Sequence, residues 1–144
     1  MKYLYPCTIE GNVDDGNGFV VSFPDIPWAH TGGFTFREAL ILAEDCLVVA
    51  LSHYVDHDLD LPAPSPYHEG QELLTVQPVV AAQLDLYTAM REQKLSAAEL
   101  AKRLGICEDD AAALVNLDYR TPIGEVAKAL KALGCELAAT EQVA

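Results

Sequence analysis

Three alternate prolines, in the segment Leu61-Pro-Ala-Pro-Ser-Pro66, limit how this chain of 144 residues can fold. Proline fixes φ and carries no backbone donor, so we expect this segment to be an extended spacer outside any helix or central strand. Another proline, Pro78, closes the strand-like run that follows the spacer. We therefore predict a domain boundary here, with one domain over residues 1–78 and a second over residues 79–144.

Up to this boundary, the sequence first alternates apolar and polar residues as strands do and then changes to the period of a helix. We predict strands at residues 3–10, 18–23 and 28–31, a helix at residues 36–57, and a last strand at residues 72–77. Pro6 lies inside the first run and favours an edge strand, because proline cannot donate to a sheet ladder. Thr35 and Glu38 form a capping box before the helix. The expected order is β-β-β-α-β.

After the boundary, the period is helical. We predict helices at residues 79–93, 96–104, 108–116 and 122–133. Ser96 and Glu99 form a capping box at the start of the second of these helices. Gly105 is expected to end that helix in a left-handed conformation, with Ile106 as the apolar plug of the turn. Thr121 is expected to cap the last helix, with Pro122 at its first position. Two short helices around a glycine turn, inside a four-helix bundle, are the layout of a helix-turn-helix, so the predicted class is α+β.

The chain is strongly acidic, with 22 Asp and Glu against 9 Lys and Arg and a formal net charge of -13. The first 78 residues hold two basic residues against twelve acidic ones, a balance of −10. Such a charge disfavours a protein that wraps nucleic acid phosphates with its whole surface. It favours a partner that is itself basic.

No apolar run is long enough to span a membrane, because Glu44 and Asp45 interrupt the most apolar stretch, residues 39–51. The first residues show no signal core, so we expect a cytoplasmic protein. The chain has four widely spaced cysteines, Cys7, Cys46, Cys107 and Cys135. Without a Cys-x-x-Cys motif, they indicate reduced and mostly buried thiols rather than a disulfide framework or a zinc site.

Several segments follow one another as they do in a known family. They are the strand Gly18-Phe-Val-Val-Ser-Phe-Pro-Asp-Ile-Pro27, the turn Thr31-Gly-Gly33, the helix start Arg37-Glu-Ala-Leu40, the proline spacer, Asn116-Leu117, and Ala129-Leu-Lys-Ala-Leu-Gly134. In addition, Leu95-Ser-Ala-Ala-Glu-Leu-Ala-Lys-Arg-Leu-Gly-Ile106 resembles the first half of a Cro/C1-type helix-turn-helix. In this order, the segments resemble the HicB-type antitoxin of the HicAB toxin–antitoxin family, in its longer form.

The resemblance implies a role rather than a reaction. The first domain would be an incomplete RNase H-like domain without nuclease activity, and it would cover the active site of a small basic, mRNA-cleaving, HicA-like toxin. The second domain would bind the operator of its own operon, so that the antitoxin represses its own synthesis. We expect a homodimer or a higher oligomer, with no catalytic residue, no cofactor and no metal.

Within this interpretation, the toxin-binding candidates are Asp14, Asp15, Asp25, Ile26 and Trp28. The first two lie in a predicted hairpin turn, and Asp25 lies between prolines. Trp28 is the only tryptophan. Aromatic anchors are enriched at interfaces, but a lone tryptophan is also common as half-buried core, so the sequence leaves both roles open.

The DNA-binding candidates lie in and after the predicted helix-turn-helix: Lys102, Arg103, Glu108, Asp109, Ala112, Tyr119, Arg120 and Thr121. The second helix of this motif normally places polar or basic side chains on bases and phosphates. Here it begins with Glu108, Asp109 and Asp110, which suit the helix dipole but repel phosphates. The alternative is that this domain only dimerises and packs.

Three other interpretations are kept in view. A stand-alone helix-turn-helix regulator with an acidic dimerisation domain would need no toxin. A metal-dependent nuclease would need several of the acids Glu10, Asp14, Asp15, Asp25, Glu44 and Asp45 to converge, which their predicted positions do not favour. His53 and His57 have the spacing of a zinc-binding pair, with Cys46 one heptad back, but a role at the helix end or toward another subunit is favoured.

Overall fold

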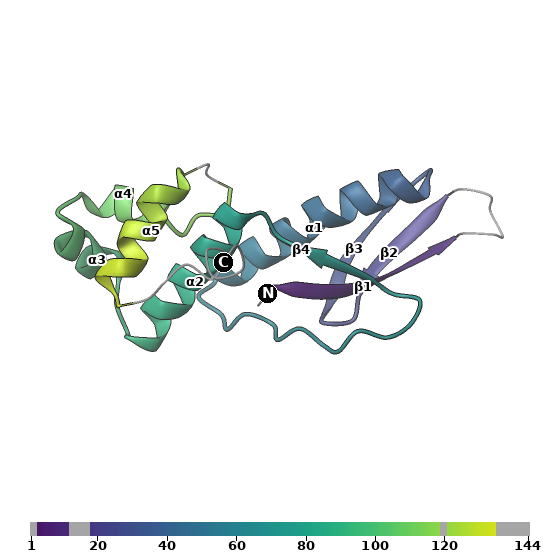
Figure 1. Ribbon diagram of the computed structural model, residues 1–144, viewed down its shortest axis with the longest axis horizontal. Coiled ribbons are helices and arrows are strands. Elements are labelled where there is room, and N and C mark those ends of the chain that lie inside the picture. The colour runs from purple at the N-terminus through teal and green to yellow at the C-terminus, as the bar shows by residue number, and fades with distance from the viewer. Residues whose placement is uncertain (1–2, 12–17, 119–120, 135–144) are drawn as a thin grey trace, which may run out of the picture. The chain divides into compact units, whose positions relative to one another are not determined.

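The computed structural model describes residues 3–11, 18–118 and 121–134, and Figure 1 shows the helices and strands. Their internal contacts divide the chain into two compact units, one within residues 2–76 and the other within residues 77–144. We call the first the sheet unit and the second the helical unit. The predicted α+β class is confirmed, because an antiparallel sheet precedes a run of helices.

The sheet unit combines antiparallel strands with one long helix. In chain order, its described elements are β1 (Leu4–Gly11), β2 (Phe19–Phe23), β3 (Ile26–Gly33), α1 (Phe36–Asp56) and β4 (Glu72–Thr75). The strands lie in the order β3-β2-β1-β4, and α1 packs on the sheet most extensively along β3 (Figure 1). The expected order β-β-β-α-β is confirmed.

The prediction that the first strand lies at an edge of the sheet is wrong. β1 pairs with β4 through Leu4–Cys7 and with β2 through Thr8–Gly11, so it is a central strand. Pro6 lies in the half of β1 that pairs with β4, opposite Leu73. The pairing with β2 begins only at Thr8, so the backbone at Pro6 has a neighbouring strand on one side and not on both. This explains how a central strand tolerates a residue without an N–H group.

Alternation along the strands places one face of the sheet beneath α1. In β2, Val21 and Phe23 are buried, whereas Val20, which precedes them and points to the other face, is half exposed. The buried side of α1 carries Ala39, Ala43, Leu47, Ala50 and Leu51. The backbones approach closely where β3 meets α1, because a Cβ atom on Gly33 would lie 2.6 Å from the backbone nitrogen of Ala39. Glycine is therefore needed at this corner.

The helical unit is built from four described helices: α2 (Pro78–Glu92), α3 (Ala97–Leu104), α4 (Glu108–Ala113) and α5 (Ile123–Ala132). One apolar cluster joins them, and its members include the buried side chains of Leu86, Leu100, Ala111, Val126 and Leu130. Each helix therefore turns its apolar stripe inward, as short amphipathic helices must do to be stable. No helix in the described residues is both long and apolar enough to cross a membrane.

Two helix boundaries differ from those predicted. α4 ends at Ala113 and not at residue 116, because the next three N–H groups donate to carbonyls three residues back, as in Leu114 N to Ala111 O at 3.2 Å. Thr121 does not cap the last helix, since its hydroxyl donates to the backbone oxygen of Ala113 at 3.4 Å. Pro122 is the N-cap instead, and α5 begins one residue later.

The caps around α3 agree with the prediction. The hydroxyl of Ser96 accepts a hydrogen bond from the backbone N–H of Glu99 at 3.2 Å. Gly105 ends the helix with a left-handed φ of 69°. At the start of α1, Thr35 accepts from the N–H of Glu38 at 3.0 Å in the same way.

Candidate functional site

One row of exposed side chains follows the outer side of α1 at intervals of four residues. It consists of Arg37, Ile41, Asp45, Val49, His53 and His57, and we call it the outer ridge. Residues four apart are neighbours on a helix surface, so these side chains form a continuous strip, which turns about 40° round the helix axis at each step. Two of them are large and apolar, with 53% of Ile41 and 66% of Val49 exposed. The strip therefore presents apolar groups on either side of a carboxylate.

Trp28 on β3 lies at the C-terminal end of the outer ridge. Half of its side chain is exposed, and its ring centroid lies 5.0 Å from that of His53 and 6.0 Å from that of Tyr54. The sequence left open whether Trp28 is an interface anchor or half-buried core. In the structure it combines both features, because one part of its side chain packs on α1 and the other faces solvent. It is available to a partner without any rearrangement of the core.

The other toxin-binding candidates occupy different environments. Asp25 accepts hydrogen bonds from the backbone N–H and the hydroxyl of Ser65, so it joins the β2–β3 turn to the proline spacer. Ile26 is completely buried and belongs to the core. Asp14 and Asp15 lie outside the described residues. The candidates are thus divided between a surface residue, a structural carboxylate and a core residue.

The spacer is also held from β1. The hydroxyl of Tyr5 donates to the backbone oxygen of Pro62 at 2.8 Å. Burial, followed by the charge of Asp25 and by Tyr54, raises the pKa of Tyr5 from its ordinary value to about 12. The sequence predicted an extended spacer but gave no sign of these two attachments, since they join residues far apart in the chain.

The acidic side chains considered for a two-metal site do not form a cluster in the described part of the sheet unit. Glu10, Glu44 and Asp45 are exposed, and Asp25 is engaged with Ser65. Among the described residues, no group of three or more His, Cys, Asp and Glu could hold a metal ion. The convergence that a two-metal nuclease requires is therefore not present among these residues.

The described cysteines are free thiols, but they are less buried than we expected. Cys7 is buried, and burial together with the charge of Glu72 raises its pKa to about 11. Cys46 is half-buried, and Cys107 is exposed at the N-cap of α4. Cys135 lies outside the described residues. The prediction of mostly buried thiols thus holds for one of these three, since Cys46 lies near the edge of the helix–sheet contact and Cys107 on a turn.

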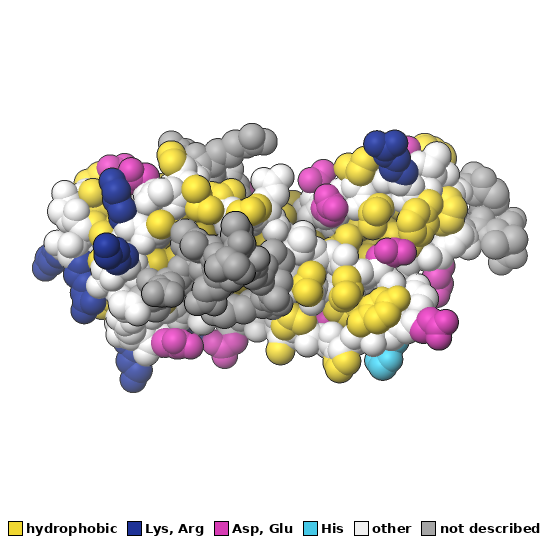
Figure 2. All heavy atoms as spheres, viewed as in Figure 1, with side chains coloured by type: hydrophobic (Ala, Val, Ile, Leu, Met, Phe, Trp, Pro, Cys, Tyr) yellow, Lys and Arg dark blue, Asp and Glu magenta, His cyan; other side chains and the backbone are white. Residues whose placement is uncertain are grey.

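In the helical unit, the DNA-binding candidates are divided by charge. Lys102 and Arg103 are exposed in the last turn of α3, and Ala112 is exposed on α4. Three exposed acids, Glu108, Asp109 and Asp110, occupy the first turn of α4. Thr121 is half-buried by its bond to Ala113, and Tyr119 and Arg120 lie outside the described residues. In Figure 2, most Lys and Arg side chains in view belong to the helical unit, whereas acidic side chains lie over both units.

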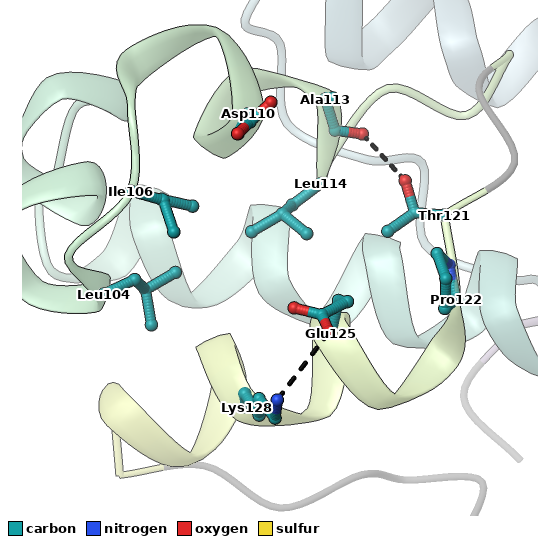
Figure 3. A pocket seen from close by; sticks show the side chains of 9 residues that line it. All are labelled: Leu104, Ile106, Asp110, Ala113, Leu114, Thr121, Pro122, Glu125 and Lys128. Carbon is teal, nitrogen blue, oxygen red and sulfur yellow. Dashed lines mark hydrogen bonds and ion pairs between the residues drawn. The ribbon is translucent and has the colours of Figure 1, made fainter.

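The helical unit also contains a cavity that the sequence did not reveal. Its volume is about 390 Å³, and its lining includes the apolar side chains of Leu104, Ile106 and Leu114. Figure 3 shows Glu125 and Lys128 beside it, joined by an ion pair of 3.7 Å. Ile106 was expected to plug the turn, but 38% of its surface is exposed and it lines this cavity instead.

Comparison with known proteins identifies the family. Residues 4–84 match the model of a family described as the HicB-like antitoxin of a bacterial toxin–antitoxin system. The chain belongs to the HicB-like antitoxin family. The matched residues include every element of the sheet unit and the first turns of α2. The resemblance expected from the strand, turn and spacer motifs is thereby confirmed.

Related HicB antitoxins extend the similarity into the helical unit. Antitoxin HicB 2 of Photorhabdus laumondii subsp. laumondii is 39% identical over 133 residues, which make up 92% of this chain and 92% of that protein. Antitoxin HicB 1 of the same organism is 38% identical over 92% of this chain and 83% of its own length. Antitoxin HicB of Escherichia coli is 36% identical over 92% of this chain and 95% of that protein.

Proposed function

We propose that this HicB-like antitoxin neutralises a small basic, HicA-like toxin ribonuclease by binding it on the sheet unit and covering its active site. We further propose that the helical unit binds operator DNA, so that the cytoplasmic protein represses its own operon as a homodimer or a higher oligomer. The family supports the antitoxin role. The observation that carries the toxin-binding proposal is the outer ridge of α1, an exposed strip in which Ile41 and Val49 flank Asp45, in a strongly acidic part of the chain.

The physical argument for toxin binding rests on the combination of area and charge. Burial of Ile41 and Val49 by a partner would remove apolar surface from water, which stabilises a complex by about 25 cal/mol for each Å². Asp45 between them, and the balance of −10 over the first 78 residues, would attract a basic protein and orient it. A neutral partner would gain the first effect but not the second.

The earlier candidates take different parts in this proposal. Trp28 would be the aromatic anchor at the end of the outer ridge. Asp14 and Asp15 would add to the attraction of a basic toxin. Asp25 and Ile26 would act indirectly, because they hold the β2–β3 turn through Ser65 and the core. We propose no catalytic residue, and we regard the sheet unit as a partial RNase H-like domain without nuclease activity.

For the helical unit, we propose that α3, the turn at Gly105 and α4 form a Cro/C1-type helix-turn-helix. The exposed Lys102 and Arg103, together with Arg120, Tyr119 and Thr121, would contact phosphates, and Glu108, Asp109 and Ala112 would face base edges. Carboxylates accept hydrogen bonds from cytosine N4, so a cytosine-containing site is the expected target.

A second candidate function for this unit is favoured by the acids of α4. Glu108, Asp109 and Asp110 place three negative charges at the helix end that would approach the DNA backbone. If their repulsion outweighs the basic residues of α3, the helical unit acts only in assembly. The antitoxin role would then depend on the sheet unit alone.

Toxin binding can be tested by titrating the full chain with a catalytically inactive form of the basic protein encoded beside it, using calorimetry. Val49→Lys should weaken binding tenfold or more, because it places a charge of the wrong sign in the outer ridge. Ile123→Lys makes the same kind of change on the exposed surface of α5 and should leave the affinity unchanged. Equal effects of the two variants, or none, would show that the toxin binds elsewhere.

DNA binding can be tested by fluorescence anisotropy with a labelled duplex from the region upstream of the gene, over a series of salt concentrations. Saturable binding that a scrambled duplex competes poorly supports operator recognition. Arg103→Ala should weaken binding to all sequences and reduce the salt dependence by about one released counterion. If no binding occurs at low salt, with or without the toxin, the helical unit is an assembly module.

A further inference from the structure

The histidines at the C-terminal end of α1 form a pair that the proposed antitoxin role does not require. His53 and His57 are both exposed and lie one helical turn apart on the outer ridge. Their ring centroids are 4.2 Å apart, with an angle of 35° between the rings. The sequence favoured a role at the helix end or toward another subunit for both. The arrangement of the two rings adds information that the spacing alone did not contain.

The hydrogen bond made by His57 determines which of its nitrogens can bind a ligand. Its Nδ1 lies 2.9 Å from the backbone oxygen of His53. A carbonyl oxygen can only accept, so Nδ1 carries the proton and donates, and in the neutral ring Nε2 keeps its lone pair. A histidine that binds a metal ion commonly donates its other ring N–H to a backbone carbonyl in this way.

The ring of His53 is held by aromatic neighbours. The indole of Trp28 contacts it at a centroid distance of 5.0 Å, and the ring of Tyr54 lies at 6.0 Å with an angle of 86°. These contacts limit the rotation of the imidazole, so less conformational entropy is lost when it binds a ligand. Both partners of the pair are therefore partly fixed in position.

The separation of the rings fits a shared ion. Metal–nitrogen distances of about 2.0–2.1 Å place two nitrogens of one tetrahedral ion about 3.3 Å apart. The rings of His53 and His57 already lie close, with centroids 4.2 Å apart, and rotation about the side-chain torsions is needed to direct both Nε2 lone pairs at one ion. Histidines four residues apart on one helix face are a known arrangement for binding zinc.

The local charge favours a cation. His57 is the C-cap of α1, where the carbonyl end of the helix dipole carries a partial negative charge. Asp56, Asp58 and Asp60 lie close to the pair in the sequence. Their carboxylates raise the local concentration of cations by long-range attraction, without being ligands themselves.

We propose that His53 and His57 form a binding site for one divalent transition-metal ion of the Cu²⁺, Ni²⁺ and Zn²⁺ class, for which imidazole is a suitable ligand. No third His, Cys, Asp or Glu among the described residues completes the set. The ion therefore keeps water at its remaining positions, and it binds reversibly rather than as a permanent structural centre. The order of affinity should be Cu²⁺ above Ni²⁺ and Zn²⁺.

The structure supplies its own reporter for this site. Trp28 is the only tryptophan of the chain and contacts His53 directly. A paramagnetic ion bound to the histidine pair lies close enough to quench the indole fluorescence. The experiment is a titration of the full-length protein, without any histidine tag, with NiCl₂ while tryptophan fluorescence is recorded. Saturable quenching that corresponds to one ion for each chain is the expected result, and ZnCl₂ should reverse it by competition.

Two variants distinguish binding at the pair from binding elsewhere. His57→Ala removes one ligand without touching the indole, and it should raise the midpoint of the Ni²⁺ titration tenfold or more. His68→Ala is the matched control, because it removes another exposed histidine of the same unit, and its midpoint should equal that of the wild type. Circular dichroism of each variant checks that the helix content is unchanged.

The titration also has a defined dependence on pH. Metal binding requires the neutral imidazole, so the midpoint for the wild type should rise as the pH is lowered. Quenching that increases linearly without saturation, or equal midpoints for His57→Ala and His68→Ala, would overturn the proposal.

Discussion

The two units of this antitoxin differ in how completely they cover their apolar side chains. Among the described residues, ten large hydrophobic side chains are exposed in the sheet unit and two, Ile106 and Ile123, in the helical unit. One helix on one sheet forms only two layers, so no described element of the sheet unit packs on the outer side of α1. Four short helices around a common core leave less apolar surface outside. The difference agrees with the proposal that a partner binds the exposed apolar surface of the sheet unit.

The strongest test of this comparison uses two residues of the same helix. Leu47 is fully buried, whereas Val49 belongs to the outer ridge. Leu47→Ala should lower the free energy of unfolding by about 2–5 kcal/mol through lost burial and a cavity. Val49→Ala should change it by less than about 0.5 kcal/mol, as is usual for exposed positions. Urea denaturation of both variants measures the difference, and a large loss for Val49→Ala would show that the outer ridge is already covered.

A second comparison concerns two glycines, one in each unit. Gly33→Ala should destabilise the protein by about 1–3 kcal/mol, because its Cβ would meet the backbone of α1 at 2.6 Å. Gly124→Ala in α5 should instead stabilise by about 0.5–1 kcal/mol, since a Cβ there meets nothing within 4 Å and alanine favours a helix. Thermal unfolding followed by circular dichroism measures whether each variant has a lower or a higher Tm than the wild type. A neutral Gly33→Ala would mean that β3 and α1 can move apart.

The attachment of the spacer predicts a dependence on alkaline pH. The pKa of Tyr5 is raised from about 10 to about 12, so its hydroxyl stabilises the fold fully below pH 10. Above that value the unfolded chain ionises first, and this contribution is lost as the pH rises through the folded pKa. Tyr5→Phe should lose about 1 kcal/mol at neutral pH and show a smaller further loss between pH 10 and pH 12 than the wild type.

The control for this experiment is Tyr67→Phe, because Tyr67 lies in the same unit and is 52% exposed. Its unfolding free energy should follow that of the wild type over the whole range. Denaturant titrations at several values of pH provide the measurement. Parallel curves for Tyr5→Phe and the wild type would contradict the assigned role of the Tyr5–Pro62 hydrogen bond.

The smallest expected effect lies at the start of α4. Cys107 is its N-cap and makes no side-chain hydrogen bond to the helix. Serine accepts a bond from the first turn at this position, so Cys107→Ser should raise the free energy of unfolding by about 0.5–1 kcal/mol. Ser96→Ala at the cap of α3 should lower it by a similar amount. If Cys107→Ser has no effect, the acids of the first turn already satisfy that helix end.

Local patterns in the sequence predicted most of the fold. The capping boxes at Thr35 and Ser96 and the left-handed Gly105 were correct, because each depends on contacts within a few residues. The errors arose where distant segments compete for the same group. The hydroxyl of Thr121 bonds to Ala113 rather than to its own helix, and Pro6 lies in a central strand because β4 returns to pair beside it.

The candidate site was predicted less completely than the fold. The position of Trp28 at a surface was one of two roles left open, and the spacing of His53 and His57 was noted. The contact between Trp28 and His53 could not be predicted from the sequence, because it exists only when β3 and α1 pack side by side. The burial of Ile26 and the bond from Ser65 to Asp25 have the same origin.

By itself, the sequence determined the order of strands and helices, the caps, the acidic balance and the family, because periodicity, turn chemistry and charge are properties of neighbouring residues. Only the tertiary structure decided which strand is central, which carboxylate is engaged, and which apolar side chains of α1 remain uncovered. Those outcomes depend on where distant segments meet. A helix that is apolar on two sides can bury one of them against its own sheet, and the packing selects which one is left for a partner.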